Sequence, residues 1–321
     1  MKAIVHVRYG RPDLLELRDV ERPEIADDQL LLRVQAASVN PVEWYGVTGF
    51  LPTRIGGGLR SPKSAAVGGD VAGRVEAVGK DVVDLRPGEE VFGTVGYSWA
   101  EYAVASPEKL ALKPANVSFE EAAAVPVAGL TALQALRDHG RVQPGQKVLI
   151  NGASGGVGTF AVQLAKVFEA DVTAVCSTRN VEQARALGAD RVVDYTQEDF
   201  TKMGERHDLM LDIAGSRSFL ACRRVLTEDA TVVVIGGPLT YRGLGPLPHI
   251  GGTILKSKGR KQKVKFFVAK INTEDLVFMA KLLETGTIKS VVERTYPLTE
   301  APKALAYLGE GHARAKIVIA I

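Results

Sequence analysis

The sequence has very little cysteine. Two cysteines, Cys176 and Cys222, occur in 321 residues, which excludes a disulfide-stapled fold and fits a reducing compartment. The sequence also lacks an apolar run long enough to span a membrane, and the segment after Met1 reads as a short strand, not a signal peptide. We therefore expect a cytoplasmic protein without a membrane span.

An excess of charge of one sign is also absent. The formal net charge is +3, with 40 Lys and Arg against 37 Asp and Glu, which is too small to favour a nucleic-acid partner. Basic residues gather locally between Lys256 and Lys265, either as a solvated loop or beside an anionic ligand or an acidic surface. The 46% of hydrophobic and 24% of charged residues are typical of a globular protein, and the length allows two domains.

A glycine-rich turn stands between a predicted strand and a predicted helix. The run Val148–Ile150 reads as a buried strand, Asn151–Gly158 as the turn, and the apolar residues from Val157 to Phe168 as one face of a helix. Glycines let the backbone approach a pyrophosphate, and the helix start offers free N–H groups and a positive dipole end. Ala153 replaces the first glycine of the usual G-x-G-x-x-G pattern, so the strand–turn–helix–strand context carries the prediction of a dinucleotide site.

Two parts of the chain differ in their predicted secondary structure. Up to about residue 125, short β runs bounded by turn formers predict a compact barrel-like β domain. From Ala122 onward, helical stretches alternate with strands, which predicts parallel βαβ units in an open sheet covered on both faces. The predicted strands of this part are Lys147–Asn151, Asp171–Cys176, Arg191–Asp194, Asp208–Ile213 and Thr231–Ile235.

The C-terminal tail is predicted to return to the β domain. It contains helical stretches Thr273–Glu284 and Glu300–Leu308 and strands Val291–Tyr296 and Lys316–Ala320. We therefore expect an α/β protein with one domain made of residues 1–125 and 270–321, and a second, doubly wound domain made of residues 126–269.

The residue after the second strand of the α/β domain bears on the choice of cofactor. NAD-binding folds place an acidic side chain there to bind the ribose hydroxyls, whereas this chain has Ser177. A serine does not repel a 2′-phosphate, Arg179 can pair with one, and Tyr195 follows the next strand. These residues favour NADPH, although Ser177 can also be a plain turn residue and Arg179 a surface charge.

The chain as a whole resembles the medium-chain dehydrogenase/reductase superfamily, and within it the zinc-free quinone oxidoreductases of the zeta-crystallin and reticulon-interacting type. The resemblance covers nearly the full length. It rests on the segments Ser38–Trp44, Gly68–Gly73, Gly129–Ala132, Asn151–Gly158 and Gly311–Val318. It implies a GroES-like β-barrel domain, completed by the C-terminal segment, beside a Rossmann domain, with the nicotinamide between the two, and a homodimer.

The resemblance also implies a set of cofactor contacts. Ser154, Gly155, Gly156 and Val157 match the pyrophosphate-binding turn, and Ser177 and Tyr195 match the 2′-phosphate contacts. The further matching positions are Thr131, Gly236, Gly237, Phe266, Phe267, His312, Ala313 and Arg314. Thr131 can instead cap a helix, and Ala315 replaces the glycine that usually follows Arg314.

The zinc ligands of the alcohol dehydrogenases in this superfamily have no counterpart here. Asn40 takes the position of the first cysteine, Gly69 and Asp70 that of the His-Glu pair, and a residue near Ala128 the last. Zinc requires thiolate or imidazole ligands in a tetrahedral array, so we expect no metal. Asp70 and Asp212 are interpreted as structural, and both cysteines as small core residues.

Without a Lewis acid, an alcohol is hard to oxidise, whereas a quinone or an enone is already electrophilic. The first hypothesis is therefore an NADPH-dependent quinone or enone reductase. Asn40 is predicted to donate its amide hydrogens to the substrate or the ribose, and Tyr45 its hydroxyl. Asn40 can also be a plain turn residue before Pro41, and Tyr45 a packing residue.

Two other functions remain open on the sequence. One is an enoyl-thioester reductase acting on an acyl-CoA or a carrier-bound chain, for which the basic stretch Lys256–Lys265 would serve a phosphorylated carrier. The other is a weakly catalytic NADPH-binding sensor or partner protein, which the lack of a strong general acid keeps open.

Overall fold

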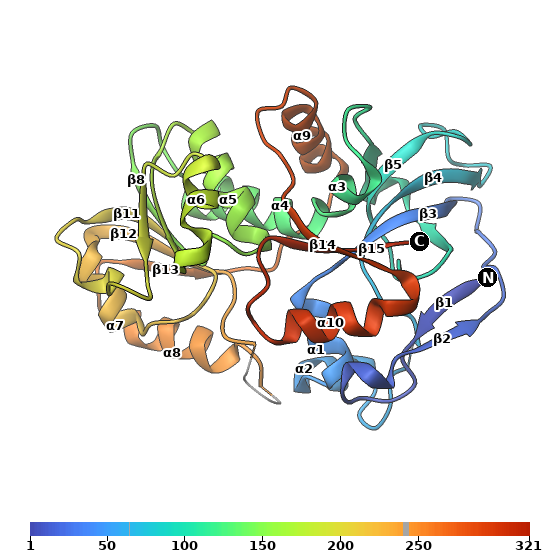
Figure 1. The fold of residues 1–321 in the computed structure, drawn as a ribbon, viewed down its shortest axis with the longest axis horizontal. Helices are drawn as coiled ribbons and strands as arrows, with labels where there is room; N and C mark the ends of the chain where they lie inside the picture. Colours follow the sequence, from blue (N-terminus) through green and yellow to red (C-terminus); the bar gives the residue numbers. More distant parts are fainter. Residues whose placement is uncertain (64, 240–243) are drawn as a thin grey trace. The chain divides into compact units, whose positions relative to one another are not determined.

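The chain folds into two compact units, each with its own core. The computed structural model describes residues 1–63, 65–239 and 244–321. Unit 1 comprises Met1–Leu130 and Lys270–Ile321, and unit 2 comprises Thr131–Ala269. The boundary between the units falls inside one helix, α4 (Pro126–Gln134). Both chain termini lie in unit 1 (Figure 1).

Unit 1 is built around a seven-stranded sheet. Six strands follow the order β14-β15-β3-β4-β5-β7, β6 pairs with β3, and β1 and β2 form a separate antiparallel pair. The strands are β1 (Lys2–Val5), β2 (Glu16–Asp19), β3 (Leu30–Val39), β4 (Asp70–Val78), β5 (Glu90–Thr94), β6 (Tyr102–Ala105), β7 (Leu110–Leu112), β14 (Val292–Pro297) and β15 (Lys316–Ala320). The tail thus returns to the N-terminal strands, because β15 pairs antiparallel with β3.

Unit 1 also contains helices, some in the tail, where helices were predicted, and others before residue 125, in the part predicted to be mainly β. These are α1 (Pro41–Thr48), α2 (Leu51–Gly57), α3 (Phe119–Ala123), α9 (Thr273–Glu284) and α10 (Ala301–Gly309). The start of α1 has a clear local cause: Asn40 is the N-cap, Pro41 the first helical residue, and a carboxyl oxygen of Glu43 accepts a hydrogen bond from the Asn40 N–H at 2.7 Å. The combination Asn-Pro-x-Glu could have predicted this helix.

Unit 2 contains a parallel sheet of six strands in the order β10-β9-β8-β11-β12-β13. They are β8 (Lys147–Asn151), β9 (Asp171–Cys176), β10 (Arg191–Asp194), β11 (His207–Asp212), β12 (Leu226–Val234) and β13 (Lys263–Phe266). This is the order of the doubly wound dinucleotide-binding fold, so the predicted fold class is confirmed. The five predicted strands are also confirmed, although β12 begins five residues earlier than expected.

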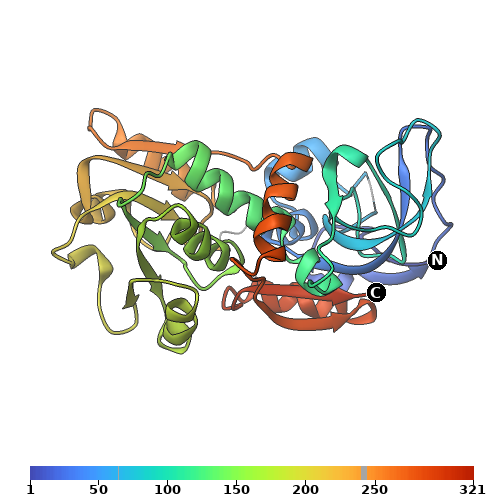
Figure 2. The same ribbon diagram turned by 90° about the horizontal axis from the view of Figure 1, so that it is seen from above.

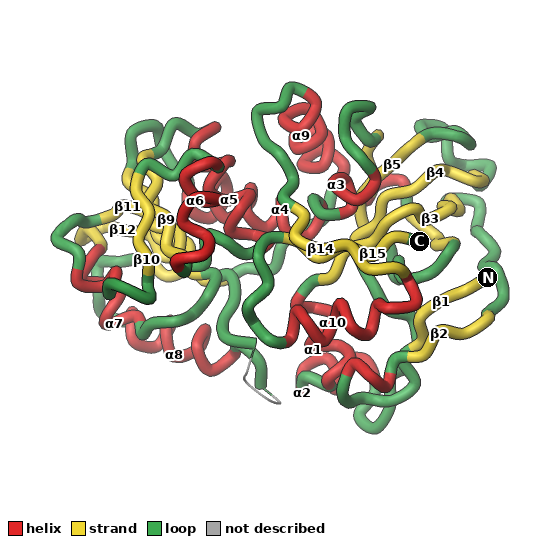
Figure 3. The backbone as a smooth tube through the Cα atoms, viewed as in Figure 1, coloured by secondary structure: helices red, strands yellow, loops and turns green. Residues whose placement is uncertain are grey.

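The helices of unit 2 lie on both faces of this sheet because the strand order reverses beside β8. They are α5 (Gly156–Val167), α6 (Val181–Ala186), α7 (Phe219–Cys222), α8 (Leu247–Ser257) and a π-helix at Ala135–Gly140. Right-handed crossovers place α5 and α6 on one face and the later helices on the other (Figures 1 and 3). Figure 2 shows the same sheet from above. Among the described residues, no helix is long and apolar enough to cross a bilayer.

Candidate cofactor and active site

The turn between β8 and α5 requires glycine at two positions. Gly152 has a φ of +97°, in the left-handed region. A Cβ on Gly158 would lie 2.1 Å from the carbonyl oxygen of Gly152, so the first turn of α5 passes directly over this loop. The helix begins with Gly155 as its N-cap, and no side chain caps it. Its N–H groups and dipole therefore face the turn without a side-chain partner, which suits an anion such as a pyrophosphate.

The four residues predicted to hold the pyrophosphate all lie on this turn. Ser154, Gly155, Gly156 and Val157 are half-buried, and they surround the start of α5. The structure thus brings them together at the carboxyl end of β8, the edge at which parallel α/β sheets bind their ligands.

The predicted 2′-phosphate residues follow the next two strands. β9 and β10 run parallel with Cys176 beside Asp194, and the Tyr195 N–H donates to the Cys176 carbonyl at 3.0 Å. Ser177 and Tyr195 therefore leave the sheet side by side. Arg179 stands on a short 3₁₀ turn after Ser177 and is exposed, and half of the Tyr195 surface is exposed.

Asn180 also belongs to this site, although it is not among the predicted contacts. Its side chain is 3% exposed, and its amide nitrogen donates to the Ser154 hydroxyl at 3.0 Å and to the Ser177 hydroxyl at 3.1 Å. It therefore connects the turn after β8 with the turn after β9. A polar residue three positions after Ser177, at the start of a helix, was the signal available in the sequence.

A carboxylate also lies at this edge of the sheet. Asp194 ends β10, and its oxygens accept hydrogen bonds from the hydroxyls of Thr178 at 2.5 Å and Thr196 at 2.7 Å. These bonds lower the pKa of Asp194, so it is ionised at neutral pH. Two threonine hydroxyls thus already solvate this charge.

A polar cluster holds the loops after β8 and β11. Asp212 accepts hydrogen bonds from the Asn151 amide at 2.8 Å, the Gly215 N–H at 3.1 Å and the His249 ring at 2.7 Å. The structural role predicted for Asp212 agrees with these bonds. His249 was not foreseen, because its partner is 37 residues away in the chain.

The glycine pair after β12 packs against the same cluster. A Cβ on Gly236 would lie 2.8 Å from the Ile213 carbonyl oxygen, and one on Gly237 would lie 3.1 Å from Pro246 and 3.6 Å from His249. Gly236 thus allows a close approach of two loops. The predicted role of this pair beneath a nicotinamide stays a prediction.

The other predicted contacts of unit 2 lie on separate elements. The Phe267 ring stacks on His139 of the π-helix, with 4.1 Å between the ring centroids, and Phe266 is exposed at the end of β13. Burial and the nearby Lys265 lower the pKa of His139, so its ring is neutral at pH 7. Thr131 is half-buried on α4, at the first position of unit 2.

In unit 1, Asn40 lies inside a buried polar network. The Lys316 ammonium donates to the Asn40 carbonyl oxygen at 2.5 Å and to Asp70 at 3.4 Å, and the Asn40 amide nitrogen donates to Asp70 at 3.0 Å and more weakly to Ser38 at 3.4 Å. Asn40, Asp70 and Lys316 are each at most 3% exposed. Both amide hydrogens of Asn40 are thus engaged within the network, and the predicted donation from Asn40 to a substrate or a ribose stays a prediction.

Glu43 is the second buried carboxyl group of this network. Burial, with the neighbouring Asp70 charge, raises the pKa of Glu43 to about 8. Glu43 is consequently protonated at neutral pH, although it accepts the Asn40 N–H. No pattern of neighbouring residues indicates a neutral carboxylic acid at this position.

Tyr45 follows on the same helix, α1. Its ring packs on Phe50 at 5.2 Å, and burial raises the pKa of its hydroxyl to about 12. The hydroxyl therefore keeps its proton over the physiological range and remains a hydrogen-bond donor.

The three predicted contacts near the tail precede β15. His312 is exposed, whereas Ala313 and Arg314 are half-buried, and the Arg314 N–H donates to the Glu293 carboxylate at 2.5 Å. Ala315 has a φ of +57°, so it adopts the left-handed conformation that a glycine would take at this position.

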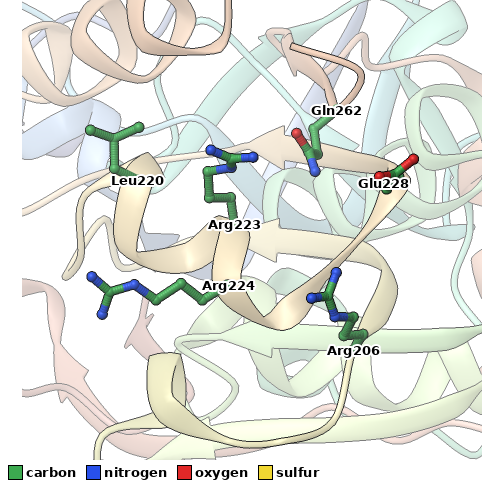
Figure 4. A pocket seen from close by; sticks show the side chains of 6 residues that line it. All are labelled: Arg206, Leu220, Arg223, Arg224, Glu228 and Gln262. Carbon is green, nitrogen blue, oxygen red and sulfur yellow. The ribbon is translucent and has the colours of Figure 1, made fainter.

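The basic stretch of unit 2 lies near the opposite edge of the sheet, at the amino ends of β12 and β13. Lys261 pairs with Glu228 at 2.6 Å, and the Lys265 ammonium donates to the His139 carbonyl at 2.7 Å. A cavity of about 420 Å³ lies beside it (Figure 4). It is lined by Arg206, Leu220, Arg223, Arg224, Glu228 and Gln262. In Figure 4 the Arg224 side chain extends away from those of Arg206 and Arg223.

Neither cysteine has the environment of a reactive thiol. Both are buried and unbonded, and burial raises the pKa of Cys176 to about 11 and that of Cys222 to about 12. Among the described residues, no three His, Cys, Asp or Glu side chains come together in a way that could hold a metal ion.

Two family models match the chain. The alcohol dehydrogenase GroES-like domain matches residues 26–135, and the zinc-binding dehydrogenase model matches residues 187–319. The first match falls largely in unit 1, and the second starts in unit 2 and continues through the tail.

Known proteins resemble the chain over its whole length. The chloroplast envelope quinone oxidoreductase homolog of Arabidopsis thaliana is 36% identical, over 99% of this chain and 98% of the relative. The chloroplastic NADPH-dependent alkenal/one oxidoreductase of the same plant is 34% identical, over 99% of this chain and 79% of the relative. Among solved structures, the quinone oxidoreductase of Coxiella burnetii has a TM-score of 0.87 and 32% identity, over 100% of this chain and 99% of that one.

Proposed function

Because the chain belongs to the medium-chain dehydrogenase/reductase family, in the branch of the quinone oxidoreductases and alkenal reductases, we propose that it is an NADPH-dependent reductase of a quinone or an α,β-unsaturated ketone. The observation that carries the proposal is the set of residues at the carboxyl ends of β8 and β9 in unit 2. There Ser177 follows β9 where a carboxylate would select NADH, and the Asn180 amide holds the hydroxyls of Ser154 and Ser177 beside the glycine turn.

The residues at this edge fit the proposed cofactor. The start of α5 and Ser154 would hold the pyrophosphate, while Ser177, Arg179 and Tyr195 would hold the 2′-phosphate. When bound, NADPH supplies the hydride for the reduction. The substrate contributes an electrophilic carbon, so the chain has to orient the reactants and stabilise the oxygen that becomes negative.

For that oxygen we propose Tyr45 as the donor and Asn40 as a positioning residue. The Tyr45 hydroxyl is protonated at neutral pH, as tyrosines ordinarily are, and burial raises its pKa further, to about 12. Asn40 is the N-cap of the helix that carries Tyr45, and Lys316 and Asp70 fix its side chain. Asn40 thus sets where α1 begins, and with it the position of Tyr45.

We also propose that the reaction needs no metal, although one matching model is named for zinc. The residues at the positions resembling zinc ligands do not fit that ion, since Asn40 and Asp70 bind the Lys316 ammonium between them. A buried ammonium in hydrogen-bond contact with both side chains would repel a divalent cation at the same place.

The substrate class can be tested with one assay panel. Purified protein is mixed with NADPH and, separately, a benzoquinone, a short enone and a crotonyl thioester, and loss of NADPH absorbance is followed. Turnover of the first two alone is expected. Turnover of the thioester alone would favour an enoyl-thioester reductase, and no turnover of any would contradict a reductase.

The cofactor assignment predicts the effect of a charge at Ser177. Ser177→Asp should weaken NADPH binding by about tenfold or more and leave NADH binding nearly unchanged, because the carboxylate repels the 2′-phosphate. Dissociation constants for both cofactors measure this. Ser177→Ala removes the hydroxyl without adding charge and serves as the control. An unchanged ratio of the two constants in Ser177→Asp would contradict the assignment.

The absence of metal chemistry predicts that chelation has no effect. Dialysis against EDTA should leave the rate with a benzoquinone unchanged within about 10%, in line with the ammonium contact above. Elemental analysis provides the independent measurement. Stoichiometric metal together with loss of activity on chelation is the result that contradicts this proposal.

We also propose an oligomeric state and a location for the protein. The edge strand β13 has a free side in the described sheet and could extend it with a second copy, which supports a homodimer that light scattering can test. A cytoplasmic location is supported by the two unpaired cysteines, whereas both plant relatives carry the chloroplast in their names. Fractionation of cells that make the protein tests the location.

A further inference from the structure

One buried amide connects the two serines proposed to bind the phosphates of the cofactor. Asn180 is the residue before α6, and its amide nitrogen donates to the Ser154 hydroxyl oxygen at 3.0 Å and to the Ser177 hydroxyl oxygen at 3.1 Å. Its carbonyl oxygen is buried and has no hydrogen-bond partner among the described residues. The bonds made by this side chain thus go to the two serines.

The direction of these bonds decides what each serine can offer a ligand. A hydroxyl has one hydrogen to donate and lone pairs that accept. Because Asn180 donates to both oxygens, neither serine has to donate its hydrogen to Asn180. Both hydrogens remain available for a phosphate, whose oxygens only accept.

The opposite orientation of the amide would reverse this arrangement. If the carbonyl oxygen of Asn180 faced the serines, it would accept both hydroxyl hydrogens and leave lone pairs directed toward the phosphates. It would also bury an NH₂ group where the structure now has a carbonyl oxygen without a partner. Buried N–H groups without a partner are rarer than buried carbonyl oxygens without one, which favours the orientation in the structure.

We propose that Asn180 is a positioning residue that orients Ser154 toward the pyrophosphate and Ser177 toward the 2′-phosphate, and that it thereby contributes to the preference for NADPH. The inference rests on the proposed use of NADPH. Asn180 acts through the two hydroxyls, and its burial keeps it from reaching a phosphate itself. Since Ser177 serves the 2′-phosphate alone, loss of Asn180 affects NADPH through both serines and NADH through Ser154 only.

The test is a pair of double-mutant cycles read by dissociation constants. Asn180→Ala, Ser177→Ala and the double variant are titrated with NADPH and with NADH, using the change in cofactor fluorescence. Asn180→Ala should weaken NADPH binding about tenfold more than NADH binding. In the Ser177→Ala background this excess should fall to about twofold or less, because the hydroxyl through which Asn180 acts is gone.

A second variant keeps the shape of the side chain. Asn180→Asp is isosteric but can only accept when ionised, so it turns both hydroxyl hydrogens inward and adds a negative charge. It should weaken NADPH binding more than Asn180→Ala does. Asn116→Ala, which removes amide bonds to the Leu283 and Glu284 carbonyls in unit 1, controls for loss of a structural amide and should leave the NADPH-to-NADH ratio unchanged.

The outcomes separate this inference from the function on which it rests. A wild-type protein that binds NADPH no tighter than NADH contradicts the proposed cofactor choice. A wild-type preference for NADPH with equal losses for both cofactors in Asn180→Ala contradicts the positioning role and leaves the cofactor choice standing. If Asn180→Ala weakens NADPH binding as much in the Ser177→Ala background as in the wild type, the positioning role is also contradicted. Thermal unfolding of each variant identifies a general loss of structure. If Asn180→Ala unfolds, the isosteric Asn180→Asp still tests the positioning role.

Discussion

At the scale of single residues, the central feature of unit 1 is a group of buried charges and amides around Asn40. Lys316 and Asp70 are an ion pair at 3.4 Å with almost no exposure, and Asn40 bonds to both. Burying a charge is costly unless it is paired, so each member depends on the others. Glu43 beside them avoids the cost by holding a proton.

The raised pKa of Glu43 predicts how stability depends on pH. The folded state holds a proton that the unfolded chain releases above pH 4.5, so the contribution of Glu43 is full below that pH and is lost as the pH rises to about 8. Glu43→Gln keeps an oxygen for the Asn40 N–H and cannot ionise. The free energy of unfolding of Glu43→Gln, measured in urea, should therefore rise relative to that of the wild type between pH 5 and about pH 8, and the difference should level off above that.

The control for this prediction is an exposed carboxylate. Glu310 lies on the surface after α10, and Glu310→Gln should run parallel to the wild type across the same range. Parallel curves for Glu43→Gln as well would show that Glu43 is ionised in the folded protein.

At the scale of elements, the turn between β8 and α5 determines what unit 2 can bind. The helix has to start close to the strand so that its N–H groups reach a ligand at the edge of the sheet. Gly158 allows this approach because its missing side chain leaves room for the carbonyl oxygen of Gly152. Asn180 then joins this turn to the next one along the sheet.

Substitution of Gly158 tests the close approach. Gly158→Ala would place a Cβ 2.1 Å from the Gly152 oxygen and 2.6 Å from the Ala153 carbonyl carbon, so the backbone of the turn has to move. NADPH binding should weaken about tenfold or more, and the melting temperature should fall. Gly204→Ala is the matched control, because no atom lies within 4 Å of its added Cβ. Equal affinities for the two variants would contradict this role of Gly158.

At the scale of the whole molecule, unit 1 is assembled from both ends of the chain. β15 lies between β14 and β3, so the last strand completes a sheet that begins near the N-terminus. Its residues Ile317, Val318 and Ile319 are buried, and Lys316 joins the network around Asn40. The N-terminal strands and β15 therefore bury their apolar side chains only when they pair with each other.

Removal of β15 is therefore expected to unfold unit 1. Burying three aliphatic side chains contributes roughly 5–9 kcal/mol, which is comparable with the whole stability of a domain. A chain ending at Ala315 should show reduced ellipticity and rapid proteolysis of unit 1. Val277→Ala, on an exposed side of α9, should change stability by less than about 0.5 kcal/mol and controls for loss of apolar surface. Native-like ellipticity and protease resistance of the shortened chain would contradict this prediction.

Several elements could be predicted because their signals are local. The strands of unit 2 are short apolar runs between turns, and the glycine turn stands between one of them and a helix, so both follow from neighbouring residues. The N-cap signal of α1 was equally local and was overlooked, since the surrounding region was treated as β. Asn180 was missed for a different reason, because its role depends on a serine 26 residues away.

Local residue patterns account for the alternation of strands and helices in unit 2, for the glycine turn and for the serine that follows β9. Each of these features depends on residues that are close together in the chain, so residue propensities and spacing are enough to predict it. The tertiary structure alone decided that Lys316 meets Asn40 from 276 residues away and that Glu43 holds a proton. Hydrogen bonds and burial depend on which segments the fold brings together. Whether a buried carboxyl group is ionised depends on the water that it loses there.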